Sequence, residues 1–315
     1  MTDRPAPPDW KLANPAAIAL SLAHARSKPS GGWLVLDASR TLLHLRKPRK
    51  YWIDGQELVV WASGDGGRSR ITVAPAPCPH MGADLSTAKV NDDGCLVCPW
   101  HGLVLSPEGL REPPWEPVRT FDDGVLLWVQ LDPGAAGATA SPFLPERPAT
   151  FIDGVIRKIA TCEPRDVISN RLDPWHGTHF HPYAFHDLVV TDATEEGLDL
   201  EVSYQITPKH VVRVGARFDC PEPNTIVMTI TSGEGTGSVV ETHATPLQHS
   251  TPLHGPSTAI VEATLATSER SGFVKACRGA SLARPLIKLL AGRLWRDDAT
   301  YAERTYEMRT RSGTT

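Results

Sequence analysis

The amino-acid sequence predicts an α+β protein of two domains: an all-β domain, then an antiparallel sheet that carries a long C-terminal helix. Three observations support this fold class. The chain has 315 residues, about twice a typical domain length of roughly 150 residues. Asp-Gly pairs, which are strong hairpin signals, separate β-prone runs in the N-terminal half. One long helical pattern, from about Ala283 to Arg309, closes the sequence.

Residues 1–30 are expected to form an extension with one helix. Asn14 suits the N-cap position and Pro15 the first helical residue, and Gly31-Gly32 marks the end. The apolar side chains of this helix would lie on a membrane surface or pack against the rest of the protein. We favour packing.

Residues 31–132 are expected to form the all-β domain. Its strands include residues 42–45, 57–61 and 125–131, and its hairpins are predicted at Asp54-Gly55, Asp93-Gly94 and Asp123-Gly124. Residues 133–148 are rich in Pro, Gly and Ala and are interpreted as a linker.

Residues 149–315 are expected to form the second domain, which opens with a hairpin at Asp153-Gly154. Alternating apolar side chains at Val212, Val214 and Ala216 indicate a half-buried strand. Strands are predicted at residues 198–206, 211–218, 225–231, 239–245 and 258–267. The terminal helix should lie across the curved sheet that these strands form.

Composition excludes several classes of function. The net charge is −4 and no basic block occurs, so a nucleic-acid partner is not expected. No apolar run approaches the length of about 20 residues that spans a bilayer. The six Cys residues are spread out, and the N-terminus has no signal-peptide core. We therefore expect a reducing compartment, the cytoplasm.

Two short runs supply thiolate and imidazole ligands together. Cys78 and His80 form the first pair, Cys98 and His101 the second, and 17 residues separate His80 from Cys98. A tetrahedral zinc ion could use this set, but zinc modules usually keep the Cys pair apart from the His pair. A mixed pair in each loop favours a [2Fe-2S] cluster in which two Cys bind one iron and two His the other.

This pattern, Cys-x-His then Cys-x-x-His, resembles that of the Rieske family, and Gly82 and Gly102 follow the His residues where the family's loops turn. Rieske proteins of respiratory complexes carry one more Cys in each loop. Ala83 and Trp100 stand at those positions here, so the resemblance implies the low-potential, oxygenase type of cluster. Cys95 falls outside the ligand spacing.

A second His-rich segment lies between the two sets of strands, with four His residues from position 176 to position 186. Two imidazoles and one carboxylate form the facial triad of non-haem Fe(II) oxygenases. The segment resembles the Asp-x-x-His-x-x-x-x-His iron motif of Rieske oxygenases, which maps onto Asp173, His176 and His181. His179 is the rival ligand, but the family spacing favours His181.

The resemblance implies a third ligand, a carboxylate on the C-terminal helix. Asp298 shares a helical face with Ala291, Leu294 and Trp295, and a carboxylate in an apolar stripe needs a partner such as a metal ion. Asp297 is the alternative, but it is interpreted as a solvated salt-bridge partner of Arg293 and Arg304.

Two further residues receive roles from the resemblance. Asp173 would bridge His101 of one subunit to His176 of its neighbour in a homotrimer; alternatively, it caps a helix or orients His176. Asn170 matches a polar position that often lies beside the iron.

The resemblance spans roughly residues 30–310 and implies a terminal oxygenase whose second domain has the helix-grip (SRPBCC/Bet v1-like) fold. The cluster would pass electrons to a mononuclear Fe(II), which activates O₂ to hydroxylate, demethylate or desaturate a hydrophobic substrate. No nucleotide-binding Gly-x-Gly-x-x-Gly motif is present, so NAD(P)H would act through a reductase or ferredoxin. The alternatives are an electron carrier with a non-catalytic second domain and a zinc-binding interaction protein.

Overall fold

The computed structural model describes residues 12–64, 69–181, 183–207, 210–249 and 255–311. The chain divides into two compact units. The β unit comprises residues 30–142 and 245–257, and the helix–sheet unit comprises residues 1–29, 143–244 and 258–315. Residues 1–29 and 245–257 thus each group with the unit that is more distant in sequence.

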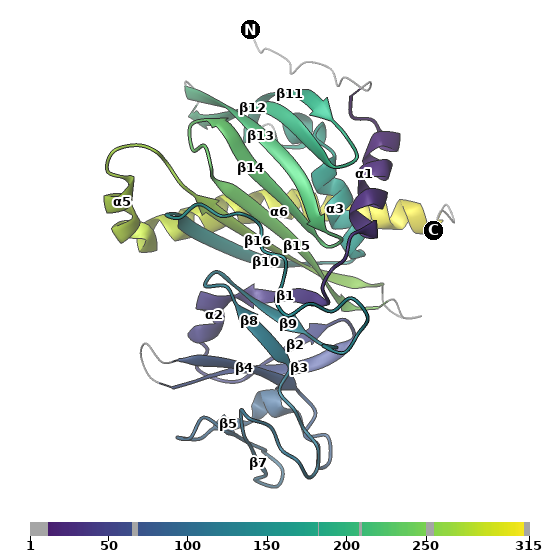
Figure 1. Cartoon of the computed structure of the whole chain (residues 1–315), viewed down its shortest axis with the longest axis vertical. Coiled ribbons are helices and arrows are strands. Elements are labelled where there is room, and N and C mark those ends of the chain that lie inside the picture. The colour runs from purple at the N-terminus through teal and green to yellow at the C-terminus, as the bar shows by residue number, and fades with distance from the viewer. Residues whose placement is uncertain (1–11, 65–68, 182, 208–209, 250–254, 312–315) are drawn as a thin grey trace. The chain divides into compact units, whose positions relative to one another are not determined.

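The β unit contains three small sheets of three strands each (Figure 1). In sheet order, their strands are β1 (Trp33–Ala38), β9 (Leu126–Gln130) and β8 (Arg119–Asp122); β2 (Arg49–Ile53), β3 (Gln56–Ser63) and β4 (Arg70–Pro75); and β5 (Lys89–Val90), β6 (Leu96–Val97) and β7 (Val104–Leu105). The short helix α2 (Ser39–Leu43) follows β1, so the prediction of a strand at residues 42–45 is wrong.

The three hairpins expected in this unit are confirmed. Asp54 and Gly55, between β2 and β3, have φ angles of 47° and 79°, which suit a two-residue hairpin turn. Gly94 and Gly124 also have positive φ, at 78° and 86°. Glycine adopts this backbone conformation without a steric penalty.

The helix–sheet unit contains one antiparallel sheet of seven strands with helices beside it, as the α+β prediction requires. In sheet order the strands are β10 (Ile152–Ala160), β16 (Ser257–Ala266), β15 (Val239–Gln248), β14 (Thr225–Gly233), β13 (His210–Glu222), β12 (Gly197–Thr207) and β11 (Phe185–Ala193). The helices are α1 (Pro15–Ser27), α3 (Pro164–Leu172), α4 (His176–Phe180), α5 (Phe273–Ala276) and α6 (Ala280–Arg311).

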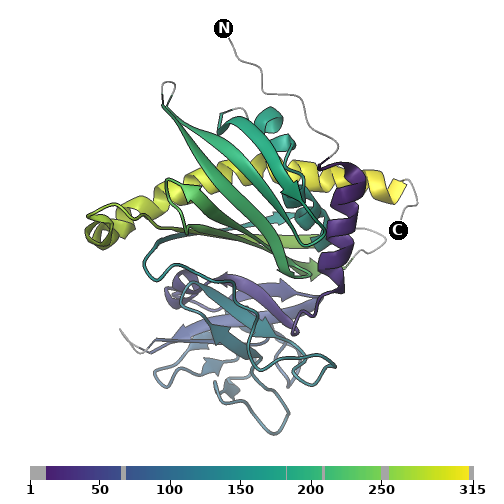
Figure 2. The same cartoon turned by 45° about the horizontal axis from the view of Figure 1, so that its top comes forward.

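Helix α6 runs along one face of this sheet in both views (Figures 1 and 2). Trp295, on its buried side, is fully buried and donates a hydrogen bond to Glu262 of β16. No helix in the described part of the chain is long and apolar enough to cross a membrane.

The N-terminal helix packs against the body of its unit, as predicted. Asn14 accepts a hydrogen bond of 2.9 Å from the N–H of Ala17, and Pro15 is the first helical residue. Ile18, Leu22 and Ala25 pack into the core cluster that also contains Trp295. The helix ends at Ser27, before the glycines that were expected to end it.

The predicted hairpin at Asp153-Gly154 is wrong, because both residues lie inside β10. A Cβ atom on Gly154 would lie 2.3 Å from Cγ2 of Ile287 on α6. The glycine therefore allows the helix to approach the strand closely, and it does not mark a turn.

Candidate metal centres

Cys78 and Cys98 begin two loops with the same backbone hydrogen bonds. In each loop the N–H of the Cys donates to the carbonyl five residues later, at 2.8 and 2.9 Å. The carbonyl of the Cys accepts from the glycine four residues later, Gly82 at 2.8 Å and Gly102 at 3.0 Å. Both glycines have positive φ, 76° and 70°, a conformation that favours glycine. The two loops therefore present their side chains in equivalent ways.

The four candidate ligands in these loops form a buried pair and an exposed pair. The Cys78 and Cys98 side chains are buried, whereas His80 and His101 are exposed, with ring centroids 4.8 Å apart. Within the described residues, the only group of three or more possible ligands with donor atoms all within 4.8 Å of one another lies elsewhere. Zinc bonds of about 2.0–2.3 Å would bring four donors to about 3.5 Å from one another. Two separate pairs fit a two-iron cluster better than a single zinc ion.

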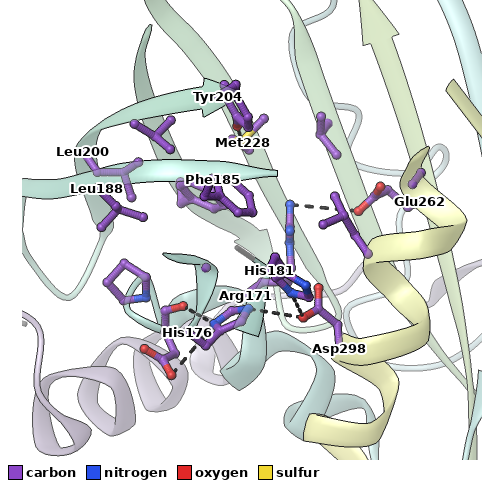
Figure 3. A pocket seen from close by; sticks show the side chains of 18 of the residues that line it. Arg171, His176, His181, Phe185, Leu188, Leu200, Tyr204, Met228, Glu262 and Asp298 are labelled. Atoms are coloured by element: carbon purple, nitrogen blue, oxygen red, sulfur yellow. Dashed lines mark hydrogen bonds and ion pairs between the residues drawn. The ribbon is translucent and has the colours of Figure 1, made fainter. Parts of the chain in front are cut away.

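That other group consists of His176, His181 and Asp298, which converge on one point (Figure 3). Oδ1 of Asp298 lies 3.2 Å from Nε2 of His176 and 2.7 Å from Nε2 of His181. Helix α4 provides His176 as its first residue and His181 as its C-cap, and α6 provides Asp298. Two imidazoles and one carboxylate are the donor set of a facial-triad Fe(II) site.

The carboxylate of this group is almost completely enclosed, since the Asp298 side chain is 3% exposed. Burial acts to raise the pKa of Asp298, but the contacts with His176 and His181 outweigh it and hold that pKa well below its usual range. Asp298 is therefore an anion at neutral pH.

Asp173 fixes the orientation of His176. It caps the C-terminal end of α3, and its Oδ1 accepts a hydrogen bond of 3.0 Å from the N–H of Trp175. Nδ1 of His176 lies 2.7 Å from the carbonyl oxygen of Asp173. Because a carbonyl can only accept, Nδ1 carries a hydrogen, and in the neutral imidazole Nε2 is then the nitrogen that faces Asp298 and can bind a metal ion.

Tyr301, which the sequence analysis missed, supports this arrangement. Its hydroxyl donates a hydrogen bond of 3.0 Å to Oδ2 of Asp173, and its ring centroid lies 5.4 Å from that of His176. Tyr301 follows Asp298 by three residues on α6, so helical spacing alone places the two on neighbouring positions of one face.

Tyr183 performs the corresponding task for His181 and was also missed. Its hydroxyl donates to Oδ2 of Asp297 at 2.7 Å, so its oxygen accepts from Nδ1 of His181 at 3.3 Å. Burial, with a further contribution from the bond to Asp297, raises the pKa of Tyr183 to about 12. The hydroxyl therefore keeps its proton. No signal in the sequence marks this residue.

The salt bridge expected for Asp297 is not found. Among the ion pairs of the described residues, Asp297 approaches His181 at 3.6 Å and neither of the arginines. The guanidinium of Arg293 instead lies over the ring of Tyr183, 3.7 Å from its centroid.

Two other candidates lie apart from the group. His179 is exposed. Asn170 is fully buried, has no hydrogen-bond partner among the described residues for either side-chain polar atom, and is not among the residues that line the cavity described below. The side chain of His186 lies outside the described part of the structure.

A cavity of about 290 Å³ opens beside the three ligands, between the sheet and α6 (Figure 3). Its walls are mainly apolar: Phe185, Leu188, Leu198, Leu200, Val202, Phe218, Met228, Val240, Ile287, Leu290, Ala291 and Leu294. His176, His181 and Asp298 lie in the same lining, so a molecule in the cavity would contact the candidate metal site directly.

Besides Asp173 and Asp298, the pair Arg171 and Glu262 places charged groups in this lining. Glu262 accepts hydrogen bonds at Oε2 from Trp295 at 2.6 Å and Thr242 at 3.3 Å. Nη2 of Arg171 lies 4.0 Å from the same oxygen, too far for a hydrogen bond, and Nε of Arg171 is buried with no partner among the described residues. Burial raises the pKa of Glu262. A lone Arg and a lone Glu form no motif, so the sequence could not identify this pair.

Comparison with known protein families identifies both halves of the chain. The Rieske [2Fe-2S] domain matches residues 32–121, and a domain of unknown function, DUF5914, matches residues 133–313. The second match covers more than half of the chain.

Two curated relatives are oxygenase components. The chain is 32% identical over 131 residues to the vanillate O-demethylase oxygenase subunit of a Pseudomonas species, covering 37% of this chain and 39% of the relative. It is 29% identical over 184 residues to the oxygenase component of a 3-ketosteroid-9-alpha-monooxygenase from Rhodococcus rhodochrous, covering 53% and 46%. The chain thus spans less than half the length of these relatives.

A solved structure shows the same fold over nearly the whole chain. Dicamba monooxygenase bound to dicamba superimposes with a TM-score of 0.65 at 15% sequence identity, covering 91% of this chain and 92% of the other. With the Rieske match and the curated relatives, this places the second domain on the fold of the Rieske oxygenases. The chain therefore belongs to the DUF5914 family, carries a Rieske [2Fe-2S] domain before the DUF5914 domain, and is similar to the oxygenase components of Rieske systems.

Proposed function

We propose that this protein is the terminal oxygenase component of a Rieske-type system. Cys78, His80, Cys98 and His101 would hold the cluster, and His176, His181 and Asp298 would hold a mononuclear Fe(II). With electrons from the cluster, the bound iron would supply O₂ activation and oxidation of an organic substrate by hydroxylation, demethylation or desaturation.

The observation that carries this proposal is the direction of the two imidazoles. Both Nδ1 hydrogens are committed to neighbouring oxygens, so the Nε2 atoms of the two rings face Oδ1 of the Asp298 anion at 3.2 and 2.7 Å. In the neutral imidazoles, the form that binds a metal, these atoms are three electron-pair donors that lie together only with a proton or a metal cation among them. A bound divalent metal ion meets this requirement.

The chain's own residues have distinct tasks in this reaction. Asp173 and Tyr183 hold the imidazoles in one tautomer and orientation. The apolar walls bind a hydrophobic substrate and keep water away from the reacting carbon. Arg171, with an unpartnered Nε and Glu262 beside it, is suited to hold an oxygen atom at the polar end of that substrate.

The working assembly includes partners. A reductase or ferredoxin would reduce the cluster, so NAD(P)H acts indirectly. The proposed domain organisation is a helical extension (1–30), a cluster domain (31–132), a linker (133–148) and a catalytic domain (149–315). We propose a cytoplasmic homotrimer in which Asp173 connects the cluster of one subunit to the iron of the next.

Metal analysis after anaerobic purification tests the proposal. The oxygenase should contain three irons and two acid-labile sulfides per chain. His176→Ala, His181→Ala and Asp298→Ala should each remove one iron and leave the visible spectrum of the cluster unchanged, because the loops with the cluster ligands are separate. His179→Ala, at the exposed His of the same helix, is the matched control and should retain three irons, as should Asp297→Ala.

Two results would overturn the proposal. A chain with two irons that accepts electrons but consumes no O₂ with any hydrophobic substrate would be an electron carrier. A colourless protein that contains zinc would be neither an oxygenase nor an electron carrier. If Asp297→Ala loses an iron and Asp298→Ala does not, the ligand assignment is wrong.

A further inference from the structure

An apolar stripe lies exposed on the first turns of α6. Leu282 is 84% exposed, Leu286 58%, Leu289 68% and Leu290 56%. Leu286 follows Leu282 by four residues, and Leu289 and Leu290 follow Leu286 by three and four, so these side chains share one helical face. Val274, on α5, is 69% exposed. In the described part of the chain, five of the 17 exposed large apolar residues fall between positions 274 and 290. Such a concentration differs from singly scattered apolar residues, which need no explanation.

The same segment is strongly basic. Residues 271–296 contain six basic residues and no acidic one, although the whole chain has a net charge of −4. Arg284 is neutralised by Asp153 at 2.7 Å. Lys275, Arg278 and Lys288 are exposed and form no ion pair with any described residue. Three exposed cationic side chains without an ion pair in the described part of the chain thus lie in the same segment as the apolar stripe.

This surface is continuous with the substrate cavity. Leu290 is 56% exposed and also lines the cavity. Ile287, Ala291 and Leu294 line the cavity from the neighbouring positions of α6. The exposed stripe therefore meets the cavity lining at Leu290. In Figures 1 and 2, α5 lies at the end of the helix–sheet unit, where α6 begins.

We propose that α5 and the first turns of α6, residues 273–290, dock this protein on an anionic membrane surface. The leucines enter the lipid, and the lysines and arginines pair with anionic headgroups. The second part of this inference rests on the proposed function: the substrate is a membrane-dissolved lipophile that enters the cavity past Leu290.

Charge argues for a membrane over a second copy of the chain. Two copies that met through this face would bring two unpaired cationic segments together, and like charges across an interface oppose association. An anionic bilayer complements both properties of the surface, since it offers negative headgroups and an apolar interior. An acidic protein partner would match the charges, but it would not account for the continuity of the stripe with a cavity that takes a lipophile.

Cosedimentation of the full iron-loaded protein with vesicles tests the docking. The protein should pellet with phosphatidylcholine vesicles that contain phosphatidylglycerol, pellet weakly with phosphatidylcholine alone, and be released by high salt. Leu286→Ser with Leu289→Ser should weaken binding at least about tenfold. Reversal of Lys275, Arg278 and Lys288 to Glu should weaken it on the order of a hundredfold.

Matched controls keep the test specific. Leu20→Ser changes a leucine of α1 that is 65% exposed, and reversal of Arg46, Lys47 and Lys89 changes the net charge by the same amount at exposed positions of the β unit. Both controls should bind vesicles like the parent. Equal weakening by the controls would overturn the assignment of the surface.

The remaining outcomes also decide the matter. Absence of vesicle binding in the parent overturns the proposal. If the two Leu→Ser changes then lower the mass found by light scattering, the stripe is an interface between copies. Cosedimentation requires no turnover, so its failure leaves the proposed oxygenase standing. A variant without the mononuclear iron, His176→Ala, should still bind vesicles.

Discussion

The hydroxyl of Tyr301 donates a hydrogen bond of 3.0 Å to Oδ2 of Asp173. The backbone carbonyl of the same aspartate accepts a hydrogen bond from Nδ1 of His176. Helix α6 therefore supports His176, a candidate iron ligand, indirectly through Asp173. Asp173 is consequently restrained from two sides before any other subunit approaches it.

Removal of this hydroxyl should loosen the support and leave the ligands in place. We expect Tyr301→Phe to retain three irons per chain and to lower turnover about three- to tenfold, in line with the loss of one hydrogen bond worth about 0.5–1.5 kcal/mol. Tyr306→Phe, at another half-buried tyrosine of α6, is the control. A loss of iron in Tyr301→Phe would mean that the residue binds the metal or stabilises the fold.

The cluster assignment predicts a specific spectroscopic change. The reduced parent protein should show an electron paramagnetic resonance signal of the mixed Cys/His type, and His101→Cys should shift that signal or abolish the cluster. Cys95→Ser should leave the signal unchanged, because Cys95 lies outside the ligand spacing. An unaltered signal in His101→Cys would remove His101 from the ligand set.

The bridging role of Asp173 predicts a defect in electron transfer alone. Asp173→Asn should keep all three irons and a reducible cluster, while turnover falls at least about a hundredfold. The altered contact between subunits should slow electron transfer from the cluster to the iron and leave the iron content unchanged. Coexpression of Cys98→Ser with His176→Ala in mixed trimers should restore part of the activity. A fully active monomer by light scattering would contradict this arrangement.

The pair in the cavity predicts an effect on substrate binding. Arg171→Met keeps much of the volume but removes the donors, so KM for a substrate with one polar oxygen should rise about tenfold, with a smaller change for a pure hydrocarbon analogue. Glu262→Gln retains a hydrogen-bond acceptor for Trp295 and should have the weaker effect. An equal change in KM for both substrates would show that Arg171 acts only on the shape of the cavity.

The buried ion pair between Arg147 and Glu241 of β15 predicts how the stability of the protein depends on pH. Arg147 donates through Nε and Nη2 to the two carboxylate oxygens of the fully buried Glu241, at 2.5 and 2.7 Å. Burial acts to raise the pKa of Glu241, but bonds from Arg147 and His243 outweigh it and leave that pKa below the ordinary value. The resulting stability is present above the unfolded pKa, near 4.5, and is lost as pH falls through the lower folded value.

Thermal unfolding measured from pH 7 down to pH 3 checks this prediction. Arg147→Met alone should lower the free energy of unfolding by about 3–5 kcal/mol, because it leaves a buried charge unpaired. The double change Arg147→Met with Glu241→Gln should recover much of that loss and show a flatter acid limb. A parent protein with the same acid limb as the double variant would contradict the assignment.

The sequence predicted those features that depend on local spacing. The two Cys/His loops, the preference for His181 over His179 and the inward face of Asp298 each follow from a motif or a helical period, and the structure gathers His176, His181 and Asp298 as expected. The ligand roles themselves stay predictions until metal is measured.

Features that depend on contacts between residues far apart in the chain could not be predicted from the sequence. Tyr183 and Arg171 act through partners that lie far away in the chain, so no periodicity reveals them. Asp153-Gly154 was read as a turn because the pair usually forms one. Only the packing of α6 against β10 explains the glycine at that point.

That glycine also bears on the width of the cavity. Ile287, which a Cβ at position 154 would displace, is part of the cavity lining. A single methyl group on the strand would push the helix outward and move one wall of the chamber away from the opposite sheet. The width of the cavity therefore depends on a residue that is not part of its lining.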